Sequence, residues 1–112
     1  MPPPPPAKKL AVLACMDARV SVERILGLEH GDAHVIRNAG AHVTDDVLRS
    51  LQVSRSLGTE EVVLLLHTDC AARDGDLDTA ARAAAAAIGG RVRGFVYDVE
   101  GGSLREVESL TS

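Results

Sequence analysis

A chain of 112 residues is long enough for one hydrophobic core but too short for two domains that each bury a core of their own. Its formal net charge of -4 and the lack of a long basic run argue against a nucleic-acid-binding surface. No stretch approaches the roughly 20 apolar residues that a membrane-spanning helix needs, so we expect no membrane association.

Five consecutive prolines, Pro2 to Pro6, follow the first methionine, and proline cannot donate a backbone hydrogen bond. We predict that residues 1–8 form an extended, disordered arm and that residues 9–112 form a single domain. The prolines also stand where a secretory signal would carry its apolar segment, so we expect a cytoplasmic location. In that compartment the two cysteines of the chain are more often free, catalytic or metal-bound than linked by a disulfide.

The first half of the chain alternates apolar runs with helix signals. The apolar run at 10–14 predicts a buried strand that ends at the first cysteine. Ser21 is a suitable N-cap for a short helix, and residues 33–36 predict a second strand. Thr44 then caps the clearest helix of the chain, which we expect to end near Gly58.

The second half continues the same alternation. Residues 61–66 are almost continuously apolar, which is typical of a strand covered on both faces of a parallel sheet, and His67 follows at its end. The alanine-rich segment 78–88 has a high helix propensity. Residues 92–99 predict the last main strand, and a glycine-rich turn leads from it to a weaker strand at 104–107.

Strands and helices that alternate in this way imply right-handed crossovers between parallel strands. We therefore predict an α/β fold with a mostly parallel β-sheet of about four strands, flanking helices and a short antiparallel C-terminal strand. Phe95 and Tyr97 are the only aromatic residues, so the core must consist of Val, Leu, Ile and Ala, which bury less area per residue. A core that thin favours a homodimer or a higher homo-oligomer.

Two short segments carry the residues with metal-binding chemistry. Cys15 ends the first strand, whereas His67 and Cys70 follow a later one. Because the carboxyl ends of parallel strands meet at one edge of a sheet, neighbouring strands would bring these side chains together. Two thiolates and one imidazole suit Zn²⁺, which we predict as the cofactor of the domain at 9–112. The alternatives are burial of the cysteines as small apolar residues and a disulfide between them.

Asp17 and Arg19 lie on the loop after Cys15 and admit two roles. Asp17 either completes a tetrahedron as the fourth metal ligand, or it pairs with Arg19 and leaves that position open to water. A change between the two arrangements would gate the metal, and rising pH would favour the open one because hydroxide then competes better for the metal. A surface ion pair of small energy is the alternative.

Four motifs occur in order along the chain: Cys-Met-Asp-Ala-Arg at 15–19, Arg-Asn-Ala-Gly at 37–40, Thr-Asp-Asp at 44–46 and His-Thr-Asp-Cys at 67–70. Together they resemble the signatures of β-class carbonic anhydrases, and residues 94–98 weakly resemble the final strand of that family. The resemblance implies a dimer of parallel-sheet subunits with each active site near the subunit contact.

The resemblance also implies roles for individual residues. It makes Cys15, His67 and Cys70 the zinc ligands, and Asp17 with Arg19 the catalytic dyad. The implied reaction is the reversible hydration of carbon dioxide to bicarbonate by zinc-bound hydroxide, so the chain would be a zinc lyase with a small-molecule substrate. Hydrolysis of carbonyl sulfide or carbon disulfide on the same site is an alternative that the sequence leaves open.

The chain also departs from the family pattern. Ala41 and Ala71 stand where members often carry glycine, and only one helix is expected between Cys70 and the final strand, where members have more. These departures support a third hypothesis, that of a zinc-binding regulatory protein without catalytic activity.

Overall fold

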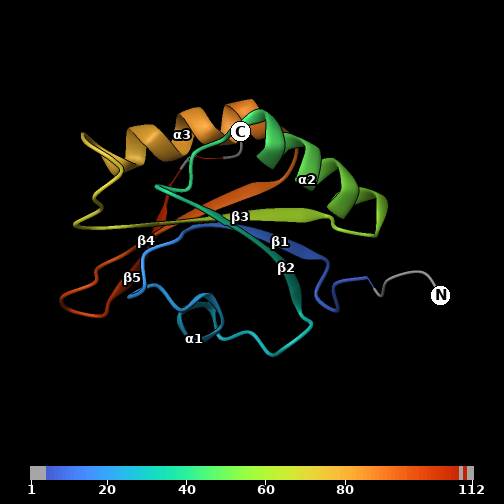
Figure 1. The fold of residues 1–112 in the computed structure, drawn as a ribbon, viewed down its shortest axis with the longest axis horizontal. Helices are drawn as coiled ribbons and strands as arrows, with labels where there is room; N and C mark the ends of the chain where they lie inside the picture. Colours follow the sequence, from blue (N-terminus) through green and yellow to red (C-terminus); the bar gives the residue numbers. More distant parts are fainter. Residues whose placement is uncertain (1–4, 109, 111–112) are drawn as a thin grey trace.

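The computed structural model describes residues 5–108 and 110 and contains one sheet with helices on both of its faces. Figure 1 shows α2 and α3 together above the sheet and α1 below it. The elements in chain order are β1 (Leu10–Cys15), α1 (Val22–Leu26), β2 (Ala33–Asn38), α2 (Asp45–Ser56), β3 (Glu61–His67), α3 (Leu77–Ile88), β4 (Val92–Tyr97) and β5 (Leu104–Val107). The structure thus confirms the α/β fold predicted from the alternation of strands and helices.

The strands lie in the order β2-β1-β3-β4-β5. The first four are parallel to one another, and β5 runs antiparallel to β4, as the sequence predicts. The register pairs Leu13 of β1 with Leu64 of β3, and Ala14 with Leu65. Because β1 and β3 are neighbours in this register, their carboxyl ends lie side by side at one edge of the sheet.

The core consists of two apolar layers, one on each face of the sheet. Successive residues of a strand point to opposite faces, so Leu13 and Leu64 pack against α2 and α3, whereas Val12 and Leu65 pack on the side of α1. Both faces of β3 are therefore covered, which explains its unbroken apolar run. The fully buried large side chains are aliphatic except for His67 at the end of β3, and the ring of Phe95 is only partly buried.

Side-chain caps set the beginnings of the two long helices. The hydroxyl of Thr44 accepts a hydrogen bond from the Val47 amide at 3.2 Å, as expected for an N-cap. The Asp76 carboxylate accepts one from the Thr79 amide at 3.0 Å, so α3 begins one residue before the predicted range. The Gly102 amide donates a hydrogen bond to the Asp98 carbonyl, and this turn ends β4 at Tyr97, two residues before the predicted end at residue 99.

The N-terminal segment meets the loop that precedes β2. Residues 1–4 of the predicted arm lie outside the described residues. Pro6 is buried, and the amides of Ala7 and Lys8 donate hydrogen bonds to the carbonyls of Gly31 and Asp32 at 3.0 and 2.9 Å. The division of the chain into an arm and a domain at residue 8 stays a prediction.

Across the described part of the chain, every helix is too short or too polar to cross a membrane.

Truncation of Leu64 tests the central position of β3. Its side chain is 0% exposed, so we expect Leu64→Ala to lower the free energy of unfolding by about 2–5 kcal/mol through lost burial and a residual cavity. Urea denaturation followed by circular dichroism measures this change. The partly exposed Leu104 on β5 is the matched control, and Leu104→Ala should cost ~1 kcal/mol or less. Similar losses for both variants would contradict the placement of β3 at the centre of the core.

Candidate metal centre

Three side chains with metal-binding atoms meet at the carboxyl edge of the sheet. Cys15 is the last residue of β1, His67 is the last residue of β3, and Cys70 follows on the next turn. The two sulfur atoms lie 3.9 Å apart, and the sulfurs and one imidazole nitrogen all lie within 4.8 Å of one another. The structure therefore brings together the residues that the sequence singles out as ligands.

The spacing of the sulfur atoms suits a single tetrahedral ion. Two sulfurs at about 2.3 Å from one tetrahedral zinc centre lie ~3.8 Å apart, and Cys15 Sγ and Cys70 Sγ lie 3.9 Å apart. A disulfide needs a sulfur separation of only about 2.05 Å, and both cysteines are free. The two sulfurs are therefore spaced as ligands of one zinc ion, and the imidazole nitrogen lies within 4.8 Å of them.

One nitrogen of the His67 imidazole is buried without a hydrogen-bond partner among the described residues. The Thr68 carbonyl can only accept, so at 2.7 Å it accepts a hydrogen bond from the Nδ1–H of His67 and leaves Nε2 as the ring atom available to a metal. That Nε2 is buried and has no hydrogen-bond partner among the described residues. A buried nitrogen without a partner is unfavourable, and a metal ion between the two sulfurs would satisfy it.

The two cysteines differ in acidity. Burial raises the pKa of Cys15, but the imidazole of His67 and the amides of Asp17 and Gly40 outweigh it and lower the pKa from 9.0 to about 7. The Gly40 amide donates to Cys15 Sγ at 3.3 Å. Burial and the neighbouring Cys15 sulfur raise the pKa of Cys70 above its ordinary value. Without metal, a first thiolate therefore forms near neutral pH at Cys15.

Asp17 is paired with Arg19, which is the second of the two arrangements that the sequence leaves open. The carboxylate accepts hydrogen bonds from Arg19 Nε at 3.0 Å and Nη2 at 2.8 Å, and the Arg19 amide adds a third at 2.8 Å. These bonds hold the pKa of Asp17 well below its ordinary value and raise that of Arg19. Asp17 Oδ2 nevertheless lies only 4.0 Å from His67 Nε2.

Arg37 anchors the loop that carries Cys15 and Asp17. Its guanidinium donates to the carbonyls of Cys15, Asp17 and Val20 at 2.9–3.0 Å. Three bonds from one rigid donor group hold the loop in a single conformation. This contact agrees with a structural role for the Arg-Asn-Ala-Gly motif.

The backbone after β2 approaches the metal-binding residues closely. Gly40 has a φ of +85°, and a Cβ at this position would lie 2.7 Å from Cδ2 of His42, so only glycine fits. Ala41 follows with a φ of +53°, a conformation that favours glycine. This explains why glycine suits the position where the resembling sequences often carry it.

Two residues of the site escape the sequence analysis. Asp69, which lies between His67 and Cys70, accepts a hydrogen bond from Arg19 Nη1 at 3.0 Å. Arg73 donates to the carbonyls of Gly40 and Ala41 and so ties the loop after β3 to the loop after β2. Neither contact has a local sequence signal, because both join segments that are far apart in the chain.

The acidity of Cys15 gives a test of the site without metal. Only the thiolate reacts with iodoacetamide, so in metal-free protein the alkylation rate of Cys15 should rise through pH 7, and that of Cys70 only above pH 9.0. Mass spectrometry of alkylated peptides measures both rates. His67→Ala should move the midpoint of Cys15 upward, because the imidazole lowers its pKa. Equal midpoints near 9.0 for both thiols would contradict the described geometry.

Comparison with known proteins identifies the family. The sequence profile described as carbonic anhydrase matches residues 10–95. The chain is 64% identical over 69 residues to β-carbonic anhydrase 1 of Mycobacterium tuberculosis, which covers 61% of this chain and 42% of that protein. It is 48% identical over 67 residues to a carbon disulfide hydrolase of an Acidianus species, which covers 59% of this chain and 33% of that protein. The chain thus spans less than half the length of these curated relatives.

The fold agrees with solved structures over nearly the whole chain. The carbonic anhydrase of Streptococcus mutans superposes with a TM-score of 0.88 at 35% sequence identity, over 96% of this chain and 87% of that one. The sequence profile covers well over half of the residues, and the solved structure extends the likeness to 96% of the chain. The chain therefore belongs to the carbonic anhydrase family, in its β class.

Proposed function

We propose that the chain is a zinc-dependent carbonic anhydrase, which interconverts carbon dioxide and bicarbonate. The observation that carries this proposal is the cluster of Cys15, His67 and Cys70, whose ligand atoms lie within 4.8 Å of one another beside the pair of Asp17 and Arg19. Membership of the β-class family supports it. The cytoplasmic location inferred from the sequence stays a prediction.

The residues of the chain have distinct roles in this proposal. Zinc supplies Lewis acidity that lowers the pKa of a coordinated water, and two thiolate ligands weaken that effect relative to three imidazoles. Cys15, His67 and Cys70 hold the ion, and the Thr68 carbonyl fixes the ring of His67. Asp17 is ionised at neutral pH because its pKa is low, so it accepts a hydrogen bond from the attacking water and orients it.

Arg19 has an electrostatic and a geometric role. Its guanidinium balances the charge of Asp17 and occupies both carboxylate oxygens from one side. This bidentate contact leaves the side of Asp17 that lies 4.0 Å from His67 Nε2 available to the reacting water. Because the pKa of Asp17 is so low, the carboxylate orients the water rather than storing its proton, and the proton leaves through another acceptor.

Hydrolysis of carbon disulfide is a second candidate function. The observation that favours it is the 48% identity to the Acidianus carbon disulfide hydrolase over 67 residues. Both reactions attack a linear, uncharged molecule at its carbon atom, so the same ligands and the same Asp17 would serve both. The described residues of the metal centre do not discriminate between oxygen and sulfur at the ends of the substrate.

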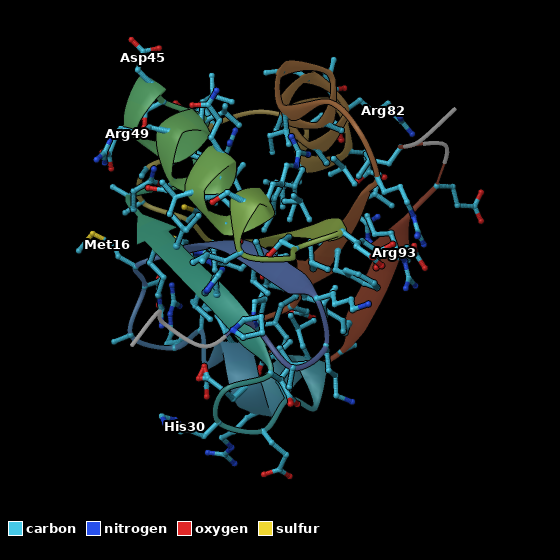
Figure 2. The ribbon with its side chains drawn as sticks, turned by 90° about the vertical axis from the view of Figure 1, so that its right-hand side faces the viewer. Met16, His30, Asp45, Arg49, Arg82 and Arg93 are labelled. Atoms are coloured by element: carbon cyan, nitrogen blue, oxygen red, sulfur yellow. The ribbon has the colours of Figure 1, made fainter. Side chains whose placement is uncertain are left out.

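The catalytic test uses purified full-length chain with its metal content measured. We expect one zinc per chain and hydration of carbon dioxide in stopped-flow assays. His67→Ala should lose zinc, whereas Asp17→Asn should keep zinc and lower kcat/KM by roughly 10–100-fold, because the water is no longer oriented. His30→Ala changes an exposed loop side chain that points away from the domain (Figure 2) and should leave both zinc and activity unchanged.

The same preparation separates the alternatives. Sulfide release from carbon disulfide with slow hydration would favour the second candidate. Stoichiometric zinc with neither activity would support a zinc-binding protein without catalysis. Chain purified without zinc, and unable to take it up, would refute all three readings of the site.

We further propose that the chain forms a homodimer through the side of the sheet that ends in β2. Three large apolar side chains are exposed on or beside that edge strand: Met16, Val35 and Val53, at 65%, 40% and 49% exposure. Figure 2 shows Met16 pointing away from the body of the protein near the end of β2. Val53 of α2 lines a groove together with Ile36 of β2. Exposed apolar residues along a free sheet edge favour contact with another chain.

Charge at this edge should disrupt the dimer. Light scattering of the wild-type chain at micromolar concentration should return twice the mass of one chain, and Val35→Lys should shift that mass toward the monomer because it buries an unpaired charge in the contact. The matched control is Leu104→Lys on β5, the opposite edge of the sheet, where Leu104 has a similar exposure of 39%. A wild-type mass of one chain, or equal effects of both variants, would contradict this interface.

A further inference from the structure

The guanidinium of Arg19 is held between two carboxylates rather than one. Asp17 takes the edge formed by Nε and Nη2, at 3.0 and 2.8 Å. Asp69 takes the other side, where its carboxylate accepts from Nη1 and its backbone carbonyl accepts from Nη2, both at 3.0 Å. Since the two acids use different N–H groups, Asp69 adds contacts to Arg19 without removing those to Asp17.

The backbone at Asp69 adopts a conformation that aims both acceptors at Arg19. Its φ is +53°, which is uncommon for a residue other than glycine but accessible to aspartate. The carboxylate is 71% exposed, so burial does not explain its position. Asp69 belongs to the short segment between His67 and Cys70, and its contact therefore connects the loop of Asp17 to the segment that carries two proposed metal ligands.

From this arrangement we infer that Asp69 is a positioning residue, which holds Arg19 against Asp17 and thereby keeps the Asp17 carboxylate off the metal. The inference rests on the proposed function of this site. A long arginine side chain loses rotamer freedom when it forms an exposed ion pair, and this entropic cost cancels much of the favourable electrostatic energy of the pair. Asp69 holds the guanidinium on the side opposite Asp17. The side chain of Arg19 therefore loses less conformational entropy when it binds Asp17.

The distance from Asp17 to the imidazole shows why this matters. Asp17 Oδ2 lies 4.0 Å from His67 Nε2, the atom that faces the metal position. Asp17 is therefore near enough to become a fourth ligand if Arg19 releases it. An Asp17 on the metal would occupy the position that the attacking water needs. Asp69 then acts on the reaction through Arg19, without touching the substrate or the metal.

The first test uses metal-free full-length chain. The Nε–H proton of Arg19, bonded to Asp17, should give a slowly exchanging signal in ¹H–¹⁵N NMR spectra. Asp69→Gly removes the carboxylate and tolerates the positive φ, and it should speed that exchange about two- to five-fold, as expected for an exposed ion pair. Asp69→Asn keeps a neutral acceptor and should have a smaller effect. Asp74→Asn, which changes another exposed carboxylate of the following loop, should leave the exchange unchanged.

The second test uses cobalt-loaded full-length chain and thiocyanate as an anion that competes for the open metal position. The visible absorption bands of cobalt report its ligands. If Asp69→Gly lets Asp17 reach the metal, thiocyanate should bind about two- to five-fold more weakly than in the wild type. In the Asp17→Asn background, where the competing carboxylate is absent, Asp69→Gly should have no such effect. A general structural disturbance would weaken binding in both backgrounds.

The outcomes separate this inference from the proposed function. Unchanged Arg19 exchange in Asp69→Gly overturns the inference, whether or not the chain binds metal. Faster exchange with thiocyanate affinity lowered equally in both backgrounds also overturns it, because Asp17 is then not the competitor. A chain that shows the predicted exchange and affinity changes but does not hydrate carbon dioxide would support the inference and refute the proposed activity.

Discussion

The parallel pairing of β1 with β3 is the constraint on which the candidate site depends. Cys15 and His67 are remote in sequence, and only the register that sets Ala14 beside Leu65 puts the ends of the two strands at the same level. Because side chains alternate across a strand, a shift of one residue would turn either side chain to the other face of the sheet. The same register is fixed by burial on both faces, since each strand has an apolar layer above and below it. Packing of the core therefore sets the position of Cys15, at the end of β1, relative to His67, at the end of β3.

Hydrogen bonds from arginine side chains fix the positions of the loops that follow the strands. The core is aliphatic and has few large side chains, so apolar packing does little to order the segments beyond the strand ends. Arg37 instead holds three carbonyls of the loop after β1, and Arg73 holds two of the loop after β2. Each guanidinium donates to these backbone carbonyls from a neighbouring segment of the chain. The loops around the metal position are thus linked to one another as well as to the sheet.

The elements and the three clustered residues were predictable because their signals are local. Apolar runs mark β1 and β3, Thr44 marks the start of α2, and two cysteines and a histidine at strand ends indicate a metal. The contact of Asp69 with Arg19 was not predictable, since it depends on a positive φ and on the separation of two loops, which no residue pattern encodes. The choice of Asp17 between metal and Arg19 was open for the same reason. The end of β4 was placed two residues too late, because Val99 continues the apolar run while the turn at Asp98 interrupts it.

The acidities of the two cysteines connect this geometry to metal binding. With the sulfurs only 3.9 Å apart, a thiolate on Cys15 opposes the ionisation of Cys70, and the raised pKa of Cys70 reflects this along with its burial. Near neutral pH the metal-free site therefore holds one thiolate, beside an imidazole whose free nitrogen already faces it. A divalent cation that binds both sulfurs must displace the proton of Cys70, so metal uptake releases protons and strengthens as pH rises. The pairing of Asp17 with Arg19 favours formation of this second thiolate, because the guanidinium offsets the negative charge of the Asp17 carboxylate beside the two sulfurs.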